Sequence, residues 1–130
     1  MPNPKRILIV DDSSNVRRLV RANLESHSGF QICGEAADGL EAIDIAIGLK
    51  PDLIILDLCM PRMNGLEVAG TLKHLLRLTP IILFTLHEDI LSENQTRAVG
   101  IKSVVSKMGE MNILFSEVQR LVDSARSASV

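Results

Sequence analysis

Acidic side chains follow two of the apolar runs in this chain, at the point where each run ends. Asp11 and Asp12 come directly after Ile7–Val10. Asp57 comes directly after Leu53–Leu56. Carboxylate oxygens are ligands that Mg²⁺ prefers in proteins, and a carboxylate can also attack phosphorus to give an aspartyl phosphate. These residue types therefore suit a divalent-metal site, a phosphoryl acceptor, or both.

A hydroxyl group and an ammonium group follow the two later apolar runs. Thr85 comes after Ile81–Phe84, and Lys107 lies just beyond Ile101–Val105. An ammonium group can offset the charge of phosphoryl oxygens in a transition state, and a hydroxyl can donate a hydrogen bond to one of them. Each residue alone is weakly informative, because Thr is common in strands and a single lysine is usually solvated.

The acids at the end of the first run have a simpler interpretation. Asp and Asn side chains cap helices, and acids favour helix N-termini, so Asp11 or Asp12 could serve only to start the next helix. Capping explains one acid, whereas two stand immediately behind a buried run. We therefore favour a functional role for the pair.

Five apolar runs alternate with amphipathic stretches along the chain. Runs without polar alternation suit strands that are buried on both faces of a parallel sheet, whereas the alternating run at 30–36 suits an edge strand. Strands are predicted at 7–10, 30–36, 53–56, 81–84 and 101–105, and helices at 16–24, 40–47, 66–76 and 114–125, with a short, loosely held helix within 88–99. The second helix is expected to stop at Gly48 and Pro51.

A β-α order repeated five times predicts a parallel sheet with helices on both faces. The carboxyl ends of parallel strands meet at one edge of the sheet, where ligands bind. Residues that are scattered in the sequence should therefore meet in one cleft: Asp11, Asp12, Asp57, Thr85 and Lys107. Clustered carboxylates repel one another unless a cation is present, which again favours a metal.

Composition narrows the class of protein. A chain of 130 residues with 46% hydrophobic and 23% charged residues is typical of one globular domain. The net charge is -2 and no basic stripe is visible, which argues against direct nucleic-acid binding and against a membrane surface. Cys33 and Cys59 form no disulfide or zinc pattern, and no apolar run is long enough for a signal peptide or a bilayer span, so a cytoplasmic location is expected.

Together these residues resemble the receiver domain of bacterial two-component response regulators, over essentially the whole chain. The matching segments are ILIVDD at Ile7–Asp12, the run from Asp57 through Met60, Pro61, Met63, Asn64 and Gly65, the strand-ending Thr85, and Lys107. The resemblance implies a flavodoxin-like, doubly wound five-stranded parallel sheet in the order 2-1-3-4-5, an order already known for a member of this family. The receiver domain would span 1–123, with 124–130 as a flexible tail or the start of a linker.

The resemblance also assigns roles to the residues. Asp57 would accept the phosphoryl group, Lys107 would pair with it, and Thr85 would be the switch hydroxyl. The cofactor would be Mg²⁺, and its ligands would be Asp11, Asp12, Asp57 and the carbonyl of Cys59.

The same resemblance implies the partners of the domain. The phosphoryl donor would be a sensor histidine kinase, a phosphotransfer protein or a small phosphodonor. The phosphorylated surface would act on a downstream protein target or output domain, and homodimerisation on phosphorylation is a further option. Such a domain catalyses only its own phosphorylation and dephosphorylation and is not an enzyme for external substrates.

Two residues depart from the family pattern. Val104 stands where family members usually carry Tyr or Phe, and Met108 follows the lysine where many have Pro. These departures leave the chemistry intact but bear on the family's usual route of signal transmission, so we expect coupling to rely on Thr85 and Leu86 alone and to be weaker than usual.

Three alternatives stay open. One is a degenerate, metal-independent interaction module on the same fold. Another is an aspartyl-phosphate hydrolase, which would need an acid where Cys59 stands. The third is the receiver part of a longer DNA-binding transcription regulator.

Overall fold

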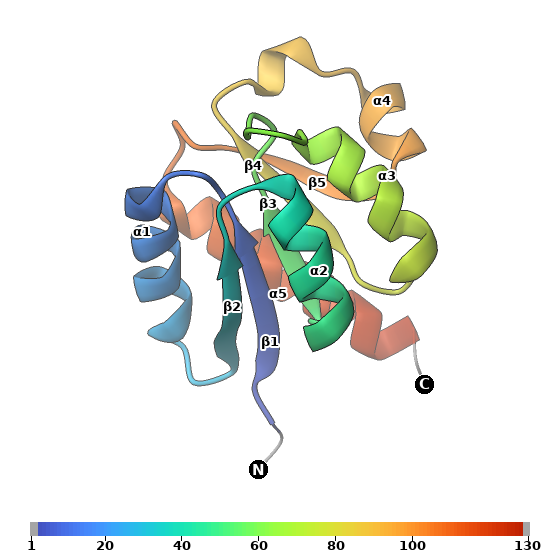
Figure 1. Ribbon diagram of the computed structural model, residues 1–130. Coiled ribbons are helices and arrows are strands. Elements are labelled where there is room, and N and C mark those ends of the chain that lie inside the picture. The colour runs from blue at the N-terminus through green and yellow to red at the C-terminus, as the bar shows by residue number, and fades with distance from the viewer. Residues whose placement is uncertain (1–2, 129–130) are drawn as a thin grey trace.

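The computed structural model describes residues 3–128 and the side chains as far as Ser124. Five parallel strands form one sheet in the order β2-β1-β3-β4-β5, as predicted. In Figure 1, α2 and α3 lie in front of this sheet and α5 lies behind it. The elements are β1 (Lys5–Val10), α1 (Ser14–Glu25), β2 (Phe30–Ala36), α2 (Gly39–Leu49), β3 (Leu53–Leu56), α3 (Gly65–Leu75), β4 (Ile81–Thr85), the 3-10 turn η1 (Glu88–Ile90), α4 (Glu93–Ala98), β5 (Ile101–Ser106) and α5 (Met111–Ala128).

The sheet is buried on both faces, which explains the continuous apolar runs. In β1, Ile7 and Ile9 pack on the side of α1 and α5, whereas Leu8 and Val10 pack on the side of α2 and α3. All four side chains are almost completely buried. Successive residues of a strand point to opposite faces, so a strand covered on both sides needs an apolar residue at every position. β1, β3 and β4 thus form the buried centre of the sheet, and the loops that follow them leave from its carboxyl edge.

Polar caps define where the helices begin. The side chains of Ser13, Asp38, Asn64 and Ser92 accept hydrogen bonds from backbone N–H groups in the first turns of α1, α2, α3 and α4. Each such cap satisfies an N–H group that has no partner within its helix. The cap at Asn64 is reciprocal, because Glu67 bonds back to the Asn64 N–H. This cap fixes the direction in which the chain enters α3 after Asp57.

The end of α2 differs slightly from the prediction. Gly48 lies within the helix, which ends at Leu49, and Lys50 forms the cap with a left-handed backbone (φ 48°) and an N–H bond to Ala46. Gly48 is exposed and has no close neighbour, so it is tolerated inside the helix. Pro51 follows and cannot continue the helical hydrogen bonding.

Two other segments refine the predicted elements. The segment 88–99 divides into η1 and α4, and α4 buries only Thr96, in line with its thin apolar face. The last helix continues past Asp123 as far as Ala128. The division between a domain at 1–123 and a tail at 124–130 remains a prediction, and residues 129–130 lie outside the described part. No helix between residues 3 and 128 is both long and apolar enough to span a bilayer.

Candidate metal and phosphoryl site

Asp11 and Asp57 are held at the ends of adjacent central strands. Asp11 follows β1, and its N–H donates to the carbonyl of Ala36 on the neighbouring strand (3.0 Å). Asp57 follows β3, and its N–H donates to the carbonyl of Val10 (2.9 Å). The hydrogen-bond ladder of the sheet therefore extends one residue beyond each strand and fixes the backbone of both acids.

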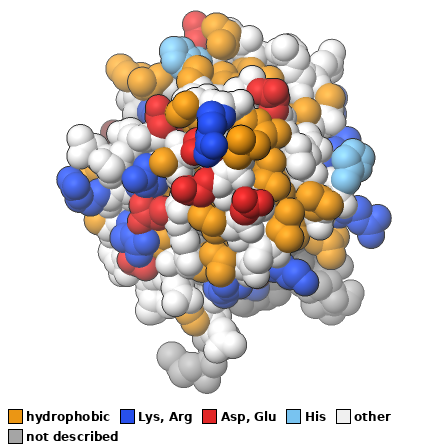
Figure 2. Space-filling model, viewed as in Figure 1, with side chains coloured by type: hydrophobic (Ala, Val, Ile, Leu, Met, Phe, Trp, Pro, Cys, Tyr) orange, Lys and Arg blue, Asp and Glu red, His pale blue; other side chains and the backbone are white. Residues whose placement is uncertain are grey.

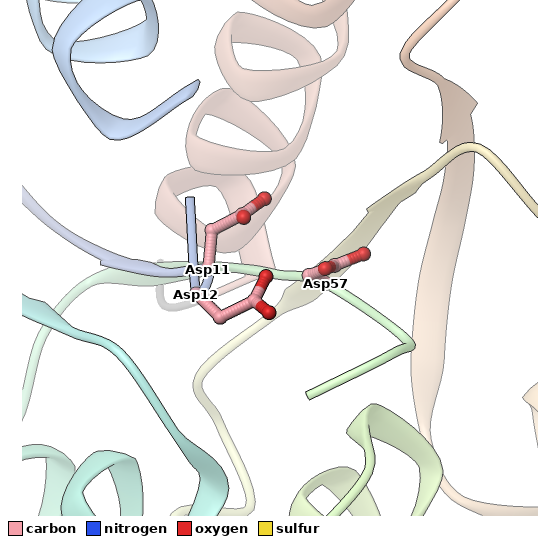
Figure 3. A group of neighbouring side chains, drawn as sticks. All are labelled: Asp11, Asp12 and Asp57. Atoms are coloured by element: carbon pink, nitrogen blue, oxygen red, sulfur yellow. The ribbon is translucent and has the colours of Figure 1, made fainter. Parts of the chain in front are cut away.

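The three predicted acids form one cluster. Carboxylate oxygens of Asp11, Asp12 and Asp57 lie within 4.8 Å of one another. Figure 3 shows the three side chains projecting to the same side of the strand ends. Asp11 is 2% exposed and Asp57 is 5% exposed, whereas Asp12 is open to solvent. The cluster therefore has a buried base and a solvent-facing mouth.

Lys107 reaches this cluster from the end of β5. Its Nζ lies 2.7 Å from Oδ2 of Asp11 and 3.4 Å from Oδ1 of Asp57. Its backbone N–H donates to the carbonyl of Thr85 (2.9 Å), which holds the loop after β5 against the end of β4. The shorter distance makes Asp11 the main partner of the ammonium group, and Asp57 shares it less closely.

Burial raises the pKa of the Asp57 carboxyl above its ordinary value, and the neighbouring charge of Asp11 raises it further. The ammonium group of Lys107 opposes this shift without cancelling it. Additional positive charge close to these acids would favour the ionised form of the Asp57 carboxyl. One lysine thus leaves the three-carboxylate cluster short of positive charge.

The donor set fits a hard divalent cation. All the side-chain donors are carboxylate oxygens, without His or a thiolate, and one side of the cluster is open to water. Mg²⁺ favours a few carboxylates together with water or phosphate oxygens over a complete protein cage. The residues present therefore suit Mg²⁺ better than a transition metal that prefers nitrogen or sulfur.

Thr85 occupies the last position of β4, between the ends of β3 and β5. Its side chain is completely buried, and its Oγ1 accepts a hydrogen bond from the N–H of His87 (3.1 Å). The hydroxyl thus stabilises the start of the loop after β4. A new partner for this hydroxyl would change the environment of Leu86 and His87.

The loop between β3 and α3 passes close to Asp57. The N–H of Gly65 donates to the carbonyl of Leu58 (2.8 Å), and a Cβ at Gly65 would collide with the carbonyl oxygen of Asp57. The side chain of Cys59 in this loop is exposed. The ligand that the resemblance assigns to this residue is its backbone carbonyl. Arg62 forms an ion pair with Asp38 (2.6 Å), which joins the loop to the N-cap of α2.

The sequence model of the protein family named response regulator receiver domain matches residues 7–119 of this chain. The chain belongs to this family. The site residues described above lie at the strand ends and in the loops of a two-component receiver domain with the flavodoxin-like fold.

Known relatives share most of this receiver domain. A protein-glutamate methylesterase/protein-glutamine glutaminase of Thermotoga maritima is 32% identical over 95% of the chain, which covers 37% of that protein. The transcriptional regulatory protein PdtaR of Mycobacterium tuberculosis is 31% identical over 95% of the chain, which covers 59% of that protein. The chain thus spans less than two thirds of the length of these relatives.

Solved structures show the same fold. The response regulator domain of Thermotoga maritima CheB has a TM-score of 0.80 at 28% identity, and the match covers 94% of this chain and 96% of that one. A CheY-like receiver domain protein from Methanospirillum hungatei has a TM-score of 0.86 at 21% identity, covering 96% of this chain and 98% of that one. The second similarity concerns the fold alone.

In the structure of the receiver domain, the site is also contacted by a residue that the sequence patterns did not single out. Arg17, on α1, donates from its Nη1 to the carbonyl oxygen of Asp11. Its Nε also pairs with Glu35 on β2 (2.8 Å), and Arg21 binds the other carboxylate oxygen of Glu35 (2.6 Å). Burial alone would raise the pKa of Glu35, but the hydrogen bonds from Arg21 and Arg17 outweigh it and hold the pKa below its usual value.

This network ties the backbone of Asp11 to α1 and β2. An amphipathic pattern explains why the apolar face of α1 is buried, but it does not specify which arginine on the polar side reaches the strand end. No signal in the sequence distinguished Arg17 from Arg18, because only the three-dimensional path of β2 places Glu35 beside it.

Proposed function

We propose that this receiver domain accepts a phosphoryl group on Asp57 in the presence of Mg²⁺ and signals by a change of its surface. The observation that carries the proposal is the cluster of three carboxylates within 4.8 Å, with the ammonium group of Lys107 against two of them. The cluster combines a nucleophile, a metal-type donor set and a fixed cation. A structural ion pair would need only one carboxylate.

Asp11, Asp12 and Asp57 would hold Mg²⁺ through their carboxylates, and Cys59 would add its backbone carbonyl. When bound, Mg²⁺ would neutralise charge on the phosphoryl oxygens and on the clustered acids. The buried and hydrogen-bonded positions of Asp11 and Asp57 give these donors a defined place, and the exposed Asp12 completes the set from the solvent side.

The chemical step requires little of the protein beyond positioning. A carboxylate oxygen of Asp57 attacks the phosphorus atom and forms the new O–P bond. With a phosphohistidine donor, the P–N bond breaks and its electron pair stays on the imidazole of the sensor kinase or phosphotransfer protein. With a small phosphodonor, the corresponding P–O bond breaks. Lys107, whose Nζ lies near Asp11 and Asp57, would offset the charge on the transferred oxygens.

Thr85 links this step to the surface. In the structure its hydroxyl oxygen accepts a bond from His87, and its own hydroxyl proton is free to turn toward a new acceptor at Asp57. Movement of Thr85 would displace Leu86 and the loop that leads to η1. We propose that the face made by 86–99 and 101–106 then binds a downstream protein target or output domain, or a second copy of the chain.

Similar proteins support these assignments. A solved complex with 25% identity and a TM-score of 0.79 is described as the CheX-CheY-BeF3-Mg+2 complex of Borrelia burgdorferi, and that match covers 91% of this chain and 89% of that one. That complex therefore contains BeF3 and magnesium, and by analogy we propose Mg²⁺ as the cofactor here. On the composition and the resemblance set out above, we also propose a cytoplasmic location, no direct nucleic-acid contact, and no turnover of an external substrate.

A second candidate function is that of the receiver part of a longer regulator. The relatives that match nearly the whole chain include a methylesterase and a transcriptional regulatory protein, both much longer than the matched part. In that case the phosphorylation chemistry would be the same, and the output would belong to another segment. Immunodetection of the native protein in its own cells would separate the two by size.

The decisive experiment measures intact mass after incubation with acetyl phosphate and Mg²⁺. The wild-type chain should gain the mass of one phosphoryl group, and EDTA should abolish the gain. The Asp57→Ala variant should gain nothing, whereas Asp44→Ala, which removes an exposed acid on α2, should behave as wild type. An undiminished mass gain in Asp57→Ala would refute the assignment of the phosphoacceptor.

A further inference from the structure

A cavity of about 680 Å³ lies at the opposite end of the sheet from Asp57. It is bounded by the end of α3, the connection to β4, the start of β5 and the second half of α5. In Figure 1 the strands run upward to the loops that carry the acids. The cavity lies at the other end of these strands, because its lining includes residues at the starts of β4 and β5. Its volume lies within the range of small-molecule sites in proteins.

The cavity has an apolar lining. Leu76 and Leu78 come from the α3–β4 connection, Val99 comes from the turn before β5, and Leu121 comes from α5. Leu78 is 91% exposed, which is a large apolar area for a side chain to present to water. A ligand with an apolar body would remove this area from water, which is favourable in proportion to the area buried.

Four of the residues that line the cavity are cationic, each from a different segment: Lys73, Arg77, Lys102 and Arg120. Among the side chains that the structure describes, as far as Ser124, none that lines the cavity is Asp or Glu. Figure 2 shows hydrophobic side chains beside Lys and Arg at the right-hand margin, on the side where α3 lies in Figure 1. The rim of the cavity thus carries positive charge in a chain whose net charge is negative.

Two of these cations already have partners. Arg120 pairs with Glu117 (2.8 Å), and the Nζ of Lys73 donates to the carbonyl of Ala98 (2.9 Å). Arg77 and Lys102 are exposed, and within the described side chains neither takes part in an ion pair. These two residues can therefore receive an anionic group at the mouth of the cavity without breaking an existing contact.

We propose that this cavity binds a small amphipathic anion, with an apolar body against the leucines and a carboxylate or phosphate group at Arg77 and Lys102. A cationic ligand would meet like charges at Arg77 and Lys102. A nucleic acid would need a broader basic surface than four side chains around one concavity. The site lies at the other end of the sheet from the acidic cluster and shares no residue with it, so this proposal can be tested without the chemistry proposed for Asp57.

The test uses three naphthalene probes that share a ring and differ in charge: naphthoate, naphthyl phosphate and the neutral naphthylmethanol. Binding is followed by amide chemical shifts of the ¹⁵N-labelled full chain. Saturable shifts are expected at 76–81, 99–102 and 120–124. At least one anionic probe should bind more tightly than naphthylmethanol, by roughly two- to tenfold, as expected for one or two partly exposed ion pairs. The preference between naphthoate and naphthyl phosphate identifies the anionic group.

Matched variants separate this site from general charge effects. The double variant Arg77→Gln/Lys102→Gln should lose the preference for the anions, so that all three probes bind alike. The control Arg18→Gln/Lys50→Gln removes the same charge from exposed positions on α1 and after α2 and should keep the preference. Equal affinity of the three probes for the wild-type chain, shifts centred on Asp57, or an unchanged preference in the Arg77/Lys102 variant would each overturn the proposal.

Discussion

Replacement of Gly65 by alanine tests whether the close approach of α3 to Asp57 is required. A Cβ on Gly65 would meet the Asp57 carbonyl oxygen, and it would lie 3.0 Å from the Cα of Leu58 and 3.1 Å from the carbonyl carbon of Asp57. All three atoms belong to the backbone, so no side chain can rotate away. The helix or the loop after β3 must therefore move.

The expected change in the free energy of unfolding of Gly65→Ala follows from two opposing effects. Overpacking of a tight site costs about 1–3 kcal/mol, and replacing Gly by Ala in a helix returns at most about 1 kcal/mol, less at the first helical position. We expect the free energy of unfolding of Gly65→Ala to fall by about 1–2 kcal/mol. For a domain of this length that corresponds to a melting temperature roughly 4–8 °C lower.

Gly48→Ala provides the matched control. Gly48 lies in α2, and a Cβ there would meet nothing within 4 Å. The same substitution should therefore raise stability by about 0.5–1 kcal/mol through helix propensity alone. Thermal and urea unfolding can be followed by far-ultraviolet circular dichroism, since the chain has no Trp or Tyr for fluorescence.

The refuting result is a Gly65→Ala variant that melts at or above the temperature of Gly48→Ala. In that case the backbone near Asp57 would be loose enough to accept a methyl group. If the variant is destabilised as expected, its phosphorylation by acetyl phosphate should also be slower than that of Gly48→Ala, because the displaced carbonyl belongs to the proposed nucleophile.

Three further predictions concern the site and its coupling. Lys107→Gln should lower the free energy of unfolding near neutral pH by about 1–3 kcal/mol, because two nearly buried carboxylates lose their charged donor. Urea titration measures this loss of stability, and Mg²⁺ should restore part of it. A Lys107→Gln variant as stable as the wild type would contradict the prediction. For Asp57, a raised pKa means that the folded state binds the proton more tightly than the unfolded state, so this contribution to stability is present at low pH and is lost as the pH rises through the raised pKa. Asp57→Asn should therefore be more stable than wild type in EDTA at neutral pH, and the advantage should shrink on acidification; an advantage that grows toward low pH would count against it. Finally, beryllofluoride with Mg²⁺ should shift the amides of 84–88 strongly and those of 100–106 weakly, because Val104 replaces the usual aromatic; large shifts throughout 100–106 would disprove this route.

The sheet and the acidic cluster could be predicted because both follow from short-range patterns. A strand that is covered on both faces requires an unbroken apolar run, and β1, β3 and β4 have one. The end of each run fixes the edge of the sheet at which Asp11 and Asp57 emerge. The strand order itself came from the resemblance to a family and was confirmed by the structure.

Other features depend on contacts that no local pattern specifies. The bond from Arg17 to the Asp11 carbonyl requires β2 to place Glu35 beside α1. The closer contact of Lys107 with Asp11 than with Asp57 depends on the path of the loop after β5. The cavity at the end of the sheet opposite Asp57 arises from segments of α3, the α3–β4 connection, β5 and α5 that only the fold brings together. The left-handed cap at Lys50 was also missed, because lysine rarely adopts that conformation.

The bonds that carry the sheet ladder one residue past β1 and β3 have a consequence for cation affinity. Fixing a free residue in one backbone conformation costs about 1–2 kcal/mol of entropy. For Asp11 and Asp57 this ordering accompanies folding, since their N–H groups are already bonded to Ala36 and Val10. Asp12 is the solvent-facing acid, so its side chain would lose the most freedom if a cation bound, and the two strand ends would offer Mg²⁺ a largely preorganised set of donors.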